Sequence, residues 1–356
     1  MAIKHYYIAL LSVALITSCA GNPYLDLTKP HHTESGFKNI DYEDNKGFFA
    51  FMKWRWEKLF KDTPDADGYQ FELINTDHEL LKNNSKPSLT WIGHATFLIQ
   101  FAQLNILTDP HFSERASPVS WAGPRRVVQA ALKIDELPEI DAVVISHDHY
   151  DSLDTASIIE LSKHNRSREL TFIVPLGFRS WFDDLDLKSV QVIELDWAEY
   201  YNIGDVRFTA EPSQHWSKRT LFDAYKRLWA SFVIESDGKR IFFAGDTGYA
   251  EHFKTLGEKY GQFDLALLPI GAYEPRWFMK SYHVNPEESV QIHLDINSQH
   301  SVAMHWGTFI LADEALDAPP VKLTEALRKH QLSESAFSVY RHGETRYLDY
   351  LITDNN

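Results

Sequence analysis

The residues that most directly suggest chemistry form the segment His147-Asp148-His149-Tyr150-Asp151, which follows a run of apolar residues. A short apolar run is typical of a buried strand, so these polar side chains come where the strand would end. Alternate residues of an extended segment point to one side, which would let His147, His149 and Asp151 converge on a cation. Imidazole and carboxylate groups suit zinc, iron or manganese. Taken alone, the segment favours a metal site, and a solvated loop rich in His and Asp is the other interpretation.

Three later segments repeat this arrangement, in which a β-rich run ends in a candidate ligand. The candidates are His215, Asp246 between two glycines, and His305. A fourth candidate, His283, stands just before a predicted helix. Because an ordered set of this kind rarely arises by chance, the sequence predicts a metal site built from histidines and carboxylates.

Short β-rich runs with a few helical segments between them must position these residues. Strands are predicted over residues 89–101, 105–108, 142–146, 170–174, 189–195, 206–210, 230–235, 240–244, 265–269 and 302–305. Helices are predicted over 154–164, 286–295 and 323–330, the second with Asn285 as N-cap and Pro286 in its first turn. Asp237-Gly238 between two apolar runs favours a hairpin. This pattern predicts one α/β body with mixed sheets covered by helices.

Composition and charge exclude several classes of protein. The 356 residues are 44% hydrophobic and 24% charged, which is ordinary for a globular chain. A formal net charge of −15 argues against a nucleic-acid partner, which requires clustered Lys and Arg. The single cysteine excludes an internal disulfide and a cysteine-rich zinc site. Metal chemistry would therefore depend on the 17 histidines and on carboxylates.

The single cysteine, Cys19, ends a segment with the features of an export signal. Lys4 precedes an apolar stretch over residues 6–16, which is shorter than the roughly 20 residues that span a bilayer. Ile16-Thr17-Ser18-Cys19 resembles a bacterial lipobox, and Ala20 in place of Asp fits passage to the outer membrane. We therefore predict a signal peptide over 1–18 and an exported protein, lipid-anchored through Cys19 at the periplasmic face of a Gram-negative outer membrane. A buried N-terminal helix is the other interpretation.

Two further segments lie between this signal and the predicted strands. Residues 19–46 are rich in Pro, Asn, Asp and Gly and are predicted to form an extended tether that could pack on the body. Residues 47–356 are predicted to form the folded domain that carries the candidate ligands. Its first segment, 48–60, is amphipathic and aromatic, which favours a helix packed on the core over a lipid-recognition surface.

The order of the candidate ligands resembles that of the metallo-β-lactamase superfamily, and longer stretches are similar to its branch with N-acylphosphatidylethanolamine-hydrolysing phospholipase D. The stretches include Thr90-Trp-Ile-Gly-His-Ala-Thr-Phe97, Leu107-Thr-Asp-Pro-His-Phe112, Pro212-Ser-Gln-His-Trp216, Ala244-Gly-Asp-Thr-Gly-Tyr249 and His305-Trp-Gly-Thr-Phe309. They are spread over nearly the whole mature chain. The resemblance implies a four-layer αββα sandwich, with two mixed sheets flanked by helices and a dinuclear, usually zinc, site along one edge.

The resemblance also implies a role for each candidate ligand. One metal would be held by His147, His149 and His215, the other by Asp151 and His305, and Asp246 would bridge the two. His283 matches a histidine that can touch the substrate's phosphoryl group, and it could also protonate the leaving alkoxide. The family has a further histidine where this chain has Ser152, so the second metal loses a nitrogen ligand unless Ser152, Asp154 or water fills the place. Manganese or iron then become alternatives to zinc.

The implied activity is metal-dependent hydrolysis of a phosphodiester by a metal-bound hydroxide, with Asp246 and His283 as catalytic residues. The substrate would be a phospholipid similar to N-acylphosphatidylethanolamine, cleaved as by a phospholipase D. A lactonase or other ester hydrolase is an alternative, and so is a non-catalytic, metal-stabilised lipoprotein. The expected partners are this phospholipid and the membrane, reached through the lipid anchor.

Several residues near these motifs have two interpretations each. Three arginines could bind phosphate or simply be solvated at the surface, namely Arg125, Arg126 and Arg276. Two histidines could orient metal ligands or pack in the core, namely His94 and His111. Asp109 could be a turn carboxylate or a hydrogen-bond partner of a metal-binding histidine, whereas strand alternation would point Asp148 away from the metals.

Overall fold

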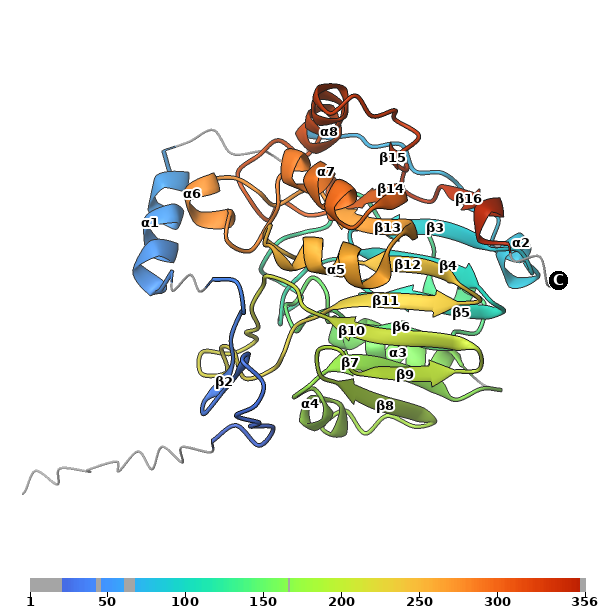
Figure 1. The fold of residues 1–356 in the computed structure, drawn as a ribbon, viewed down its shortest axis with the longest axis horizontal. Coiled ribbons are helices and arrows are strands. Elements are labelled where there is room, and N and C mark those ends of the chain that lie inside the picture. Colours follow the sequence, from blue (N-terminus) through green and yellow to red (C-terminus); the bar gives the residue numbers. More distant parts are fainter. Residues whose placement is uncertain (1–20, 43–45, 61–67, 166, 353–356) are drawn as a thin grey trace, which may run out of the picture.

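The computed structural model describes residues 21–42, 46–60, 68–165 and 167–352. In this part of the chain two seven-stranded sheets lie face to face, with helices on their outer sides (Figure 1). The predicted four-layer αββα arrangement of mixed sheets is confirmed. Cys19 and the predicted signal peptide lie outside the described residues, so lipidation stays a prediction. A search of the described residues finds no helix long and apolar enough to cross a bilayer.

The first sheet has the strand order β16-β3-β4-β5-β6-β7-β8. Its strands are β3 (Ser88–Gly93), β4 (Thr96–Phe101), β5 (Leu104–Thr108), β6 (Ala142–Val144), β7 (Leu170–Pro175), β8 (Val190–Leu195) and β16 (Thr345–Tyr347). β3, β4 and β5 pair antiparallel, whereas β5 to β8 pair parallel. The carboxyl ends of β5 to β8 therefore meet at one edge of the sheet.

The second sheet has the order β15-β14-β13-β12-β11-β10-β9. Its strands are β9 (Tyr200–Ile203), β10 (Val206–Glu211), β11 (Ser231–Ser236), β12 (Lys239–Phe243), β13 (Phe263–Pro269), β14 (Ser298–Met304) and β15 (Phe337–Ser338). β12 to β15 pair parallel, so their carboxyl ends also share one edge. The predicted hairpin between β11 and β12 is confirmed, with Asp237 and Gly238 both at positive φ.

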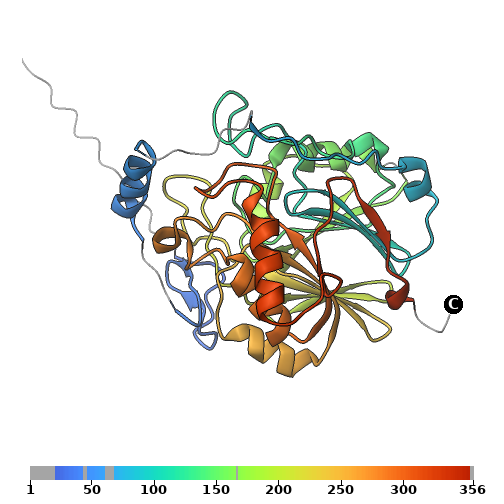
Figure 2. The ribbon, with the colours of Figure 1, turned by 90° about the horizontal axis from the view of Figure 1, so that it is seen from above.

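Helices lie on the outer faces of the two sheets and at the margin of the molecule (Figure 1). They are α2 (His78–Lys82), α3 (Thr155–His164), α4 (Arg179–Asp183), α5 (His252–Tyr260), α6 (Arg276–Met279), α7 (Pro286–Asp295) and α8 (Ala318–Lys329). In Figure 2 the green α3 and the gold α5 lie on opposite sides of the paired sheets. The predicted bounds of α7 are confirmed, with a capping box between Asn285 and Glu288, whereas α8 begins earlier than predicted.

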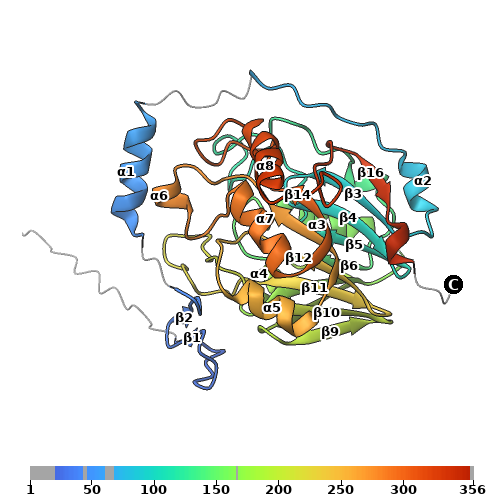
Figure 3. The ribbon, with the colours of Figure 1, turned by 45° about the horizontal axis from the view of Figure 1, so that its top comes forward.

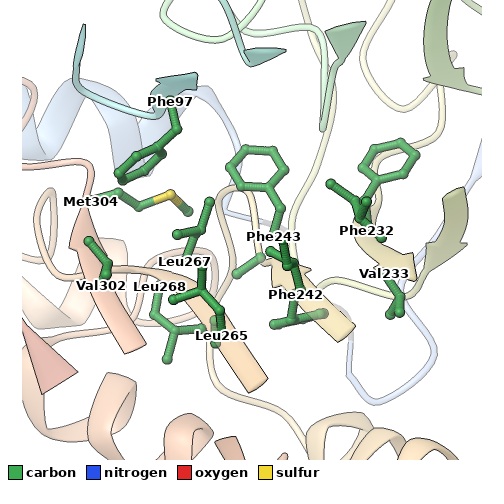
Figure 4. Close-up of a cluster of buried hydrophobic side chains, with 14 of the residues drawn as sticks. Phe97, Phe232, Val233, Phe242, Phe243, Leu265, Leu267, Leu268, Val302 and Met304 are labelled. Atoms are coloured by element: carbon green, nitrogen blue, oxygen red, sulfur yellow. The ribbon is translucent and has the colours of Figure 1, made fainter. Parts of the chain in front are cut away.

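The core explains why the strands hold their register. Ala142 and Val144 of β6 belong to the apolar cluster between the sheets, whereas Val143 belongs to the cluster beneath α3. Figure 4 shows Phe97 of β4 pointing toward Met304, the last residue of β14. Met304 is fully buried, and this fixes the position of the backbone from which His305, the next residue, extends.

The predicted run over 89–101 is wrong as a single strand, because the structure divides it into β3 and β4. The reversal contains Gly93 and His94, which have φ values of 135° and 57°. A histidine at positive φ is unfavourable in isolation, so local sequence preference does not indicate this turn. Tertiary hydrogen bonds to the His94 backbone, described below, hold it there.

The predicted aromatic helix forms as α1 (Phe48–Lys58), but the expected packing on the core is wrong for most of it. Among the described side chains of α1, Trp54 alone is buried, and it stacks on Phe278 with ring centroids 5.1 Å apart. Phe49 and Trp56 are 86% and 65% exposed. Figure 3 shows α1 at the margin of the molecule beside α6. The helix therefore presents aromatic side chains to the surroundings.

Residues 21–42 of the predicted tether lie against the body. They form a small hairpin of β1 (His32–Thr33) and β2 (Gly36–Phe37). Asn39 is buried, and its Nδ2 donates to the carbonyl of His215 at 2.9 Å. The domain boundary at residue 46 stays a prediction, but this segment contacts one of the candidate ligands directly.

Candidate metal centre

All six predicted metal ligands come together at the edge where the strands end. They follow β6 (His147, His149 and Asp151), β10 (His215), β12 (Asp246) and β14 (His305). Three groups there have donor atoms within 4.8 Å of one another, the first two sharing His215: His147, His149 and His215; His215, Asp246 and His283; and His94, Asp151 and His305. These His and Asp clusters are able to bind metal.

The first group has three imidazoles whose free nitrogens face one another. Nδ1 of His149 lies 3.1 Å from Nε2 of His215. His215 uses its Nδ1–H to donate to the carbonyl of Tyr282 at 3.0 Å, which leaves its Nε2 without a proton. An unprotonated imidazole nitrogen is the form that binds a metal ion.

A buried hydrogen-bond chain fixes His147 in the same way. Nδ1 of His147 lies 2.8 Å from Oγ of Ser146, and that hydroxyl donates to Oδ2 of Asp109 at 2.5 Å. With Nδ1 protonated, Nε2 of His147 is left free, and it is buried without a hydrogen-bond partner. Asp109 therefore supports a candidate ligand through Ser146 rather than by direct contact.

Gly245 allows this close packing. A Cβ on Gly245 would lie 2.4 Å from Cβ of Ser146, and the residue has a φ of 60°. Any side chain would therefore push β12 away from Ser146. The glycine lets the neighbouring Asp246 enter the centre.

The third group, which contains Asp151 and the imidazoles of His94 and His305, lies next to Asp246. Nε2 of His305 lies 3.2 Å from Oδ2 of Asp151 and 3.1 Å from Oδ1 of Asp246. The other oxygen of Asp246, Oδ2, lies 3.8 Å from Nε2 of His147 in the first group. Asp246 thus has one oxygen toward each group, which is the position of a bridging ligand.

Burial and charge give these groups unusual pKa values. Burial, together with the nearby His149, lowers the pKa of His147 to about 3. Burial alone would also lower the pKa of His305, but Asp246 and Asp151 raise it to about 10. The histidines around Asp151 and Asp246 hold the pKa of both carboxyl groups well below its usual range, against the effect of burial. The two buried carboxylates therefore favour positive charge beside them, which a protonated His305 or a bound metal ion supplies.

His283 lies at the mouth of the centre. Its Nδ1 is 3.9 Å from Oδ2 of Asp246, and its side chain is 18% exposed, whereas that of Asp246 is 2% exposed. Its carbonyl accepts a hydrogen bond from Nη1 of Arg276 at 2.8 Å, which fixes the loop between α6 and α7. Burial lowers its pKa to about 4, so the ring is neutral at neutral pH. This position suits contact with a substrate that approaches from outside.

Asp154 does not take over the ligand position of the histidine that Ser152 replaces, because its carboxylate is bound elsewhere. Asp154 is the N-cap of α3, and its Oδ2 accepts from the backbone and hydroxyl of Ser157 and from the hydroxyl of Ser113. Ser152 is fully buried. Two imidazole nitrogens lie close to Oδ2 of Asp151, Nε2 of His94 at 3.1 Å and Nε2 of His305 at 3.2 Å.

The structure decides between interpretations of the remaining residues. Arg126 donates to carbonyl groups of Ser113 and His111, and Arg276 pairs with Glu288 at 2.6 Å, so neither is a solvated surface arginine or a free phosphate ligand. Arg125 is exposed.

His111 is buried beside Phe309, outside the three donor groups. The prediction for Asp148 is confirmed, because it accepts from the backbone of Lys218 and pairs with Arg227 instead of the metal centre.

Comparison with known proteins agrees with this arrangement. Residues 104–306 match the beta-lactamase superfamily domain. The chain is 38% identical over 265 residues to N-acyl-phosphatidylethanolamine-hydrolyzing phospholipase D 1 of Caenorhabditis elegans, across 72% of this chain and 74% of that protein. It is 36% identical over 241 residues to the mitochondrial N-acyl-phosphatidylethanolamine-hydrolyzing phospholipase D of Saccharomyces cerevisiae, across 66% of this chain and 50% of that protein.

A solved structure shows the same fold. A possible metal-dependent hydrolase from Veillonella parvula superposes with a TM-score of 0.59 over 74% of this chain and 100% of its own, at 16% identity. The match to the superfamily domain covers the strands that carry most of the candidate ligands. The chain therefore belongs to the metallo-β-lactamase superfamily, as a metallo-hydrolase related to the N-acylphosphatidylethanolamine-hydrolysing phospholipases D.

Proposed function

We propose that this metallo-hydrolase cleaves the phosphodiester of an N-acylphosphatidylethanolamine-like phospholipid in the manner of a phospholipase D. His147, His149 and His215 would hold one metal ion, Asp151 and His305 would belong to the other, and Asp246 would be shared by the two. The observation that carries this proposal is the position of Asp246, with one oxygen 3.1 Å from Nε2 of His305 and the other 3.8 Å from Nε2 of His147. Zinc is the first expectation for both ions, with manganese or iron as alternatives.

Two adjacent metal ions supply a hydroxide at neutral pH and stabilise negative charge on the phosphate oxygens. The hydrolysis forms a bond from phosphorus to a water oxygen and breaks the bond from phosphorus to the ethanolamine oxygen. Its products are phosphatidic acid and an N-acylethanolamine. The chain's own residues hold the centre in place, and His283 at the mouth contacts the phosphoryl group.

The exposed aromatic surface near this mouth supports a lipid substrate. α1 packs against α6 through Trp54 and Phe278, and α6 leads into the loop that carries His283. Phe49 and Trp56 on α1 are exposed, as is Phe222 on the loop after β10, at 90%. Aromatic side chains favour the boundary between water and lipid. A bilayer surface in contact with them would bring the phosphodiester close to His283.

Export and lipidation of Cys19 would place the enzyme at such a surface continuously. The support for this part of the proposal is the sequence that precedes Cys19. Labelled fatty acid should be incorporated into the wild-type protein and not into Cys19→Ser, and the mature wild-type protein should fractionate with the outer membrane. Incorporation into Cys19→Ser, or none into the wild type, would contradict the anchor.

The direct test of the activity uses the full chain with vesicles that contain N-acylphosphatidylethanolamine. Mass spectrometry should detect phosphatidic acid and an N-acylethanolamine in equal amounts, formed only when zinc or manganese is present. His283→Ala should weaken substrate use with metal content unchanged, because His283 contributes contact with the phosphoryl group in this proposal. Release of free fatty acid, or faster hydrolysis of a lactone than of the phospholipid, would favour an ester hydrolase and reject the phosphodiester assignment.

A further inference from the structure

The second half of the metal centre lacks the histidine that Ser152 replaces, yet a histidine side chain stands at that half. His94 comes from the reversal between β3 and β4, far in sequence from the other candidate ligands. Its side chain is buried, and its Nε2 is 3.1 Å from Oδ2 of Asp151. The ring centroids of His94 and His305 are 4.1 Å apart.

The distances around Asp151 have the values expected for ligands that share one ion. Oδ2 of Asp151 is 3.1 Å from Nε2 of His94 and 3.2 Å from Nε2 of His305. Ligands bound tetrahedrally at about 2.0–2.1 Å are about 3.3 Å from one another. The donor atoms of His94, Asp151 and His305 all lie within 4.8 Å of one another, so a single ion can reach all three.

The backbone of His94 is held in place from several sides. Its N–H donates to Oγ1 of Thr308 at 2.9 Å, and its carbonyl accepts from Nε1 of Trp91 at 2.9 Å and from the N–H of His305 at 3.0 Å. His94 and His305 both have positive φ, at 57° and 61°. Such backbone strain persists only where the surroundings enforce it, and it is often found where side chains have a function. The same hydrogen bonds that hold His94 also fix its position relative to His305.

We propose that His94 is a ligand of the second metal ion and supplies the nitrogen that Ser152 cannot. This ion is then held by His94, Asp151 and His305, with Asp246 as the shared fourth ligand. The inference rests on the dinuclear centre of the proposed function. It identifies a ligand that the family pattern does not predict.

A second buried histidine, His111, shows why His94 in particular is suited to bind the second metal ion. It is also a buried histidine near Asp151, but it is not among the residues whose donor atoms cluster. Its Nδ1 lies 3.4 Å from Nη2 of Arg126, and its ring packs against Phe309. A cationic guanidinium next to the ring disfavours a metal ion there.

The test measures metal binding by the full chain without substrate. His94→Gln keeps a side-chain N–H that can bond to Asp151 but removes the imidazole nitrogen. We expect the wild type to bind two cobalt or zinc ions and His94→Gln to bind one, with the second affinity weakened on the order of 100-fold or more. The cobalt spectrum should lose the contribution of the second ion. Adding Ser152→His to His94→Gln should restore the second ion, because it returns the histidine found in the family.

The control is His111→Gln, which should keep both ions. If His94→Gln binds both ions with wild-type affinity, His94 only orients Asp151 and the inference is overturned. It is also overturned if His111→Gln loses the second ion instead, or if the wild type binds only one. The wild type could bind two ions, with the second dependent on His94, and still hydrolyse no lipid. This result would reject the proposed function and leave the inference about His94 intact.

Discussion

The metal centre and a second cluster, made by His31, His32 and Asp196, contain the same kinds of side chain but use them in opposite ways. In the second cluster Nε2 of His31 is 2.6 Å from one oxygen of Asp196, and Nε2 of His32 is 2.9 Å from the other. Nζ of Lys29 lies 2.5 Å from the same carboxylate. The protein itself therefore supplies the cation, and we call Lys29, His31, His32 and Asp196 the N-terminal clasp.

In the metal centre the described residues place no lysine or arginine against Asp151 or Asp246. Among the described side chains their buried charges face only imidazoles, and two of the histidines in the centre, His147 and His215, are fixed as neutral ligands by a hydrogen bond on the opposite ring nitrogen. The comparison shows that a cluster of His and Asp is not sufficient to indicate a metal site. What distinguishes the two regions is that a lysine ammonium balances the carboxylate of the clasp, whereas in the described part of the chain only histidines face the carboxylates of the metal centre.

The largest expected effect is that of Asp246→Asn, which removes the bridge and one charge from the metal centre. Metal ions contribute several kcal/mol to hydrolysis, so their loss corresponds to about a thousandfold or greater decrease in rate. Elemental analysis and the vesicle assay should both show the loss, while the circular dichroism spectrum stays that of the wild type. Full metal content in this variant would contradict the bridging position of Asp246.

The matched change in the clasp is Asp196→Asn, which should destabilise the fold and leave the metal content unchanged. It removes the negative charge that Lys29 and two histidines share, and breaking a buried ion pair costs about 3–5 kcal/mol. Urea unfolding should show the lower free energy of unfolding, and limited proteolysis should cut within residues 21–42 first. Loss of metal without loss of stability would mean that the two regions are not distinct.

The contrast also explains what the sequence could and could not predict. The ligands that follow β6, β10, β12 and β14 were predictable because each ends an apolar run, and the start of α7 was marked by Asn285 and Pro286. The N-terminal clasp could not be predicted from the sequence, because its partners Asp196 and His31 are 165 residues apart. The role of His94 was left open because its backbone conformation depends on tertiary bonds to Thr308 and His305 and not on local preference.

A smaller effect is expected from Ser146→Ala, which breaks the link between Asp109 and His147. The backbone N–H of residue 146 still donates to Asp109, at 2.7 Å in the wild type, so the fold should persist. Loss of such a supporting hydrogen bond typically lowers metal affinity about 10–100-fold. Competition with a coloured chelator would measure it, with Ser157→Ala at the N-terminus of α3 as the control. Unchanged affinity would show that the hydroxyl does not fix the imidazole of His147.

The smallest effect is a pH dependence that belongs to the clasp. Burial would raise the pKa of Asp196, but His31 and Lys29 lower it well below its usual range. A carboxyl group whose pKa is depressed on folding stabilises the protein above its unfolded pKa of about 3.9, and this contribution is lost as the pH falls toward the folded value. The stability difference between wild type and Asp196→Asn should therefore shrink by about 1 kcal/mol from about pH 5 to about pH 3. The measurement is urea unfolding of both proteins after the metal is removed with a chelator, so that the metal centre does not contribute. If the difference in free energy of unfolding stays constant between these pH values, the clasp does not stabilise Asp196 as an anion.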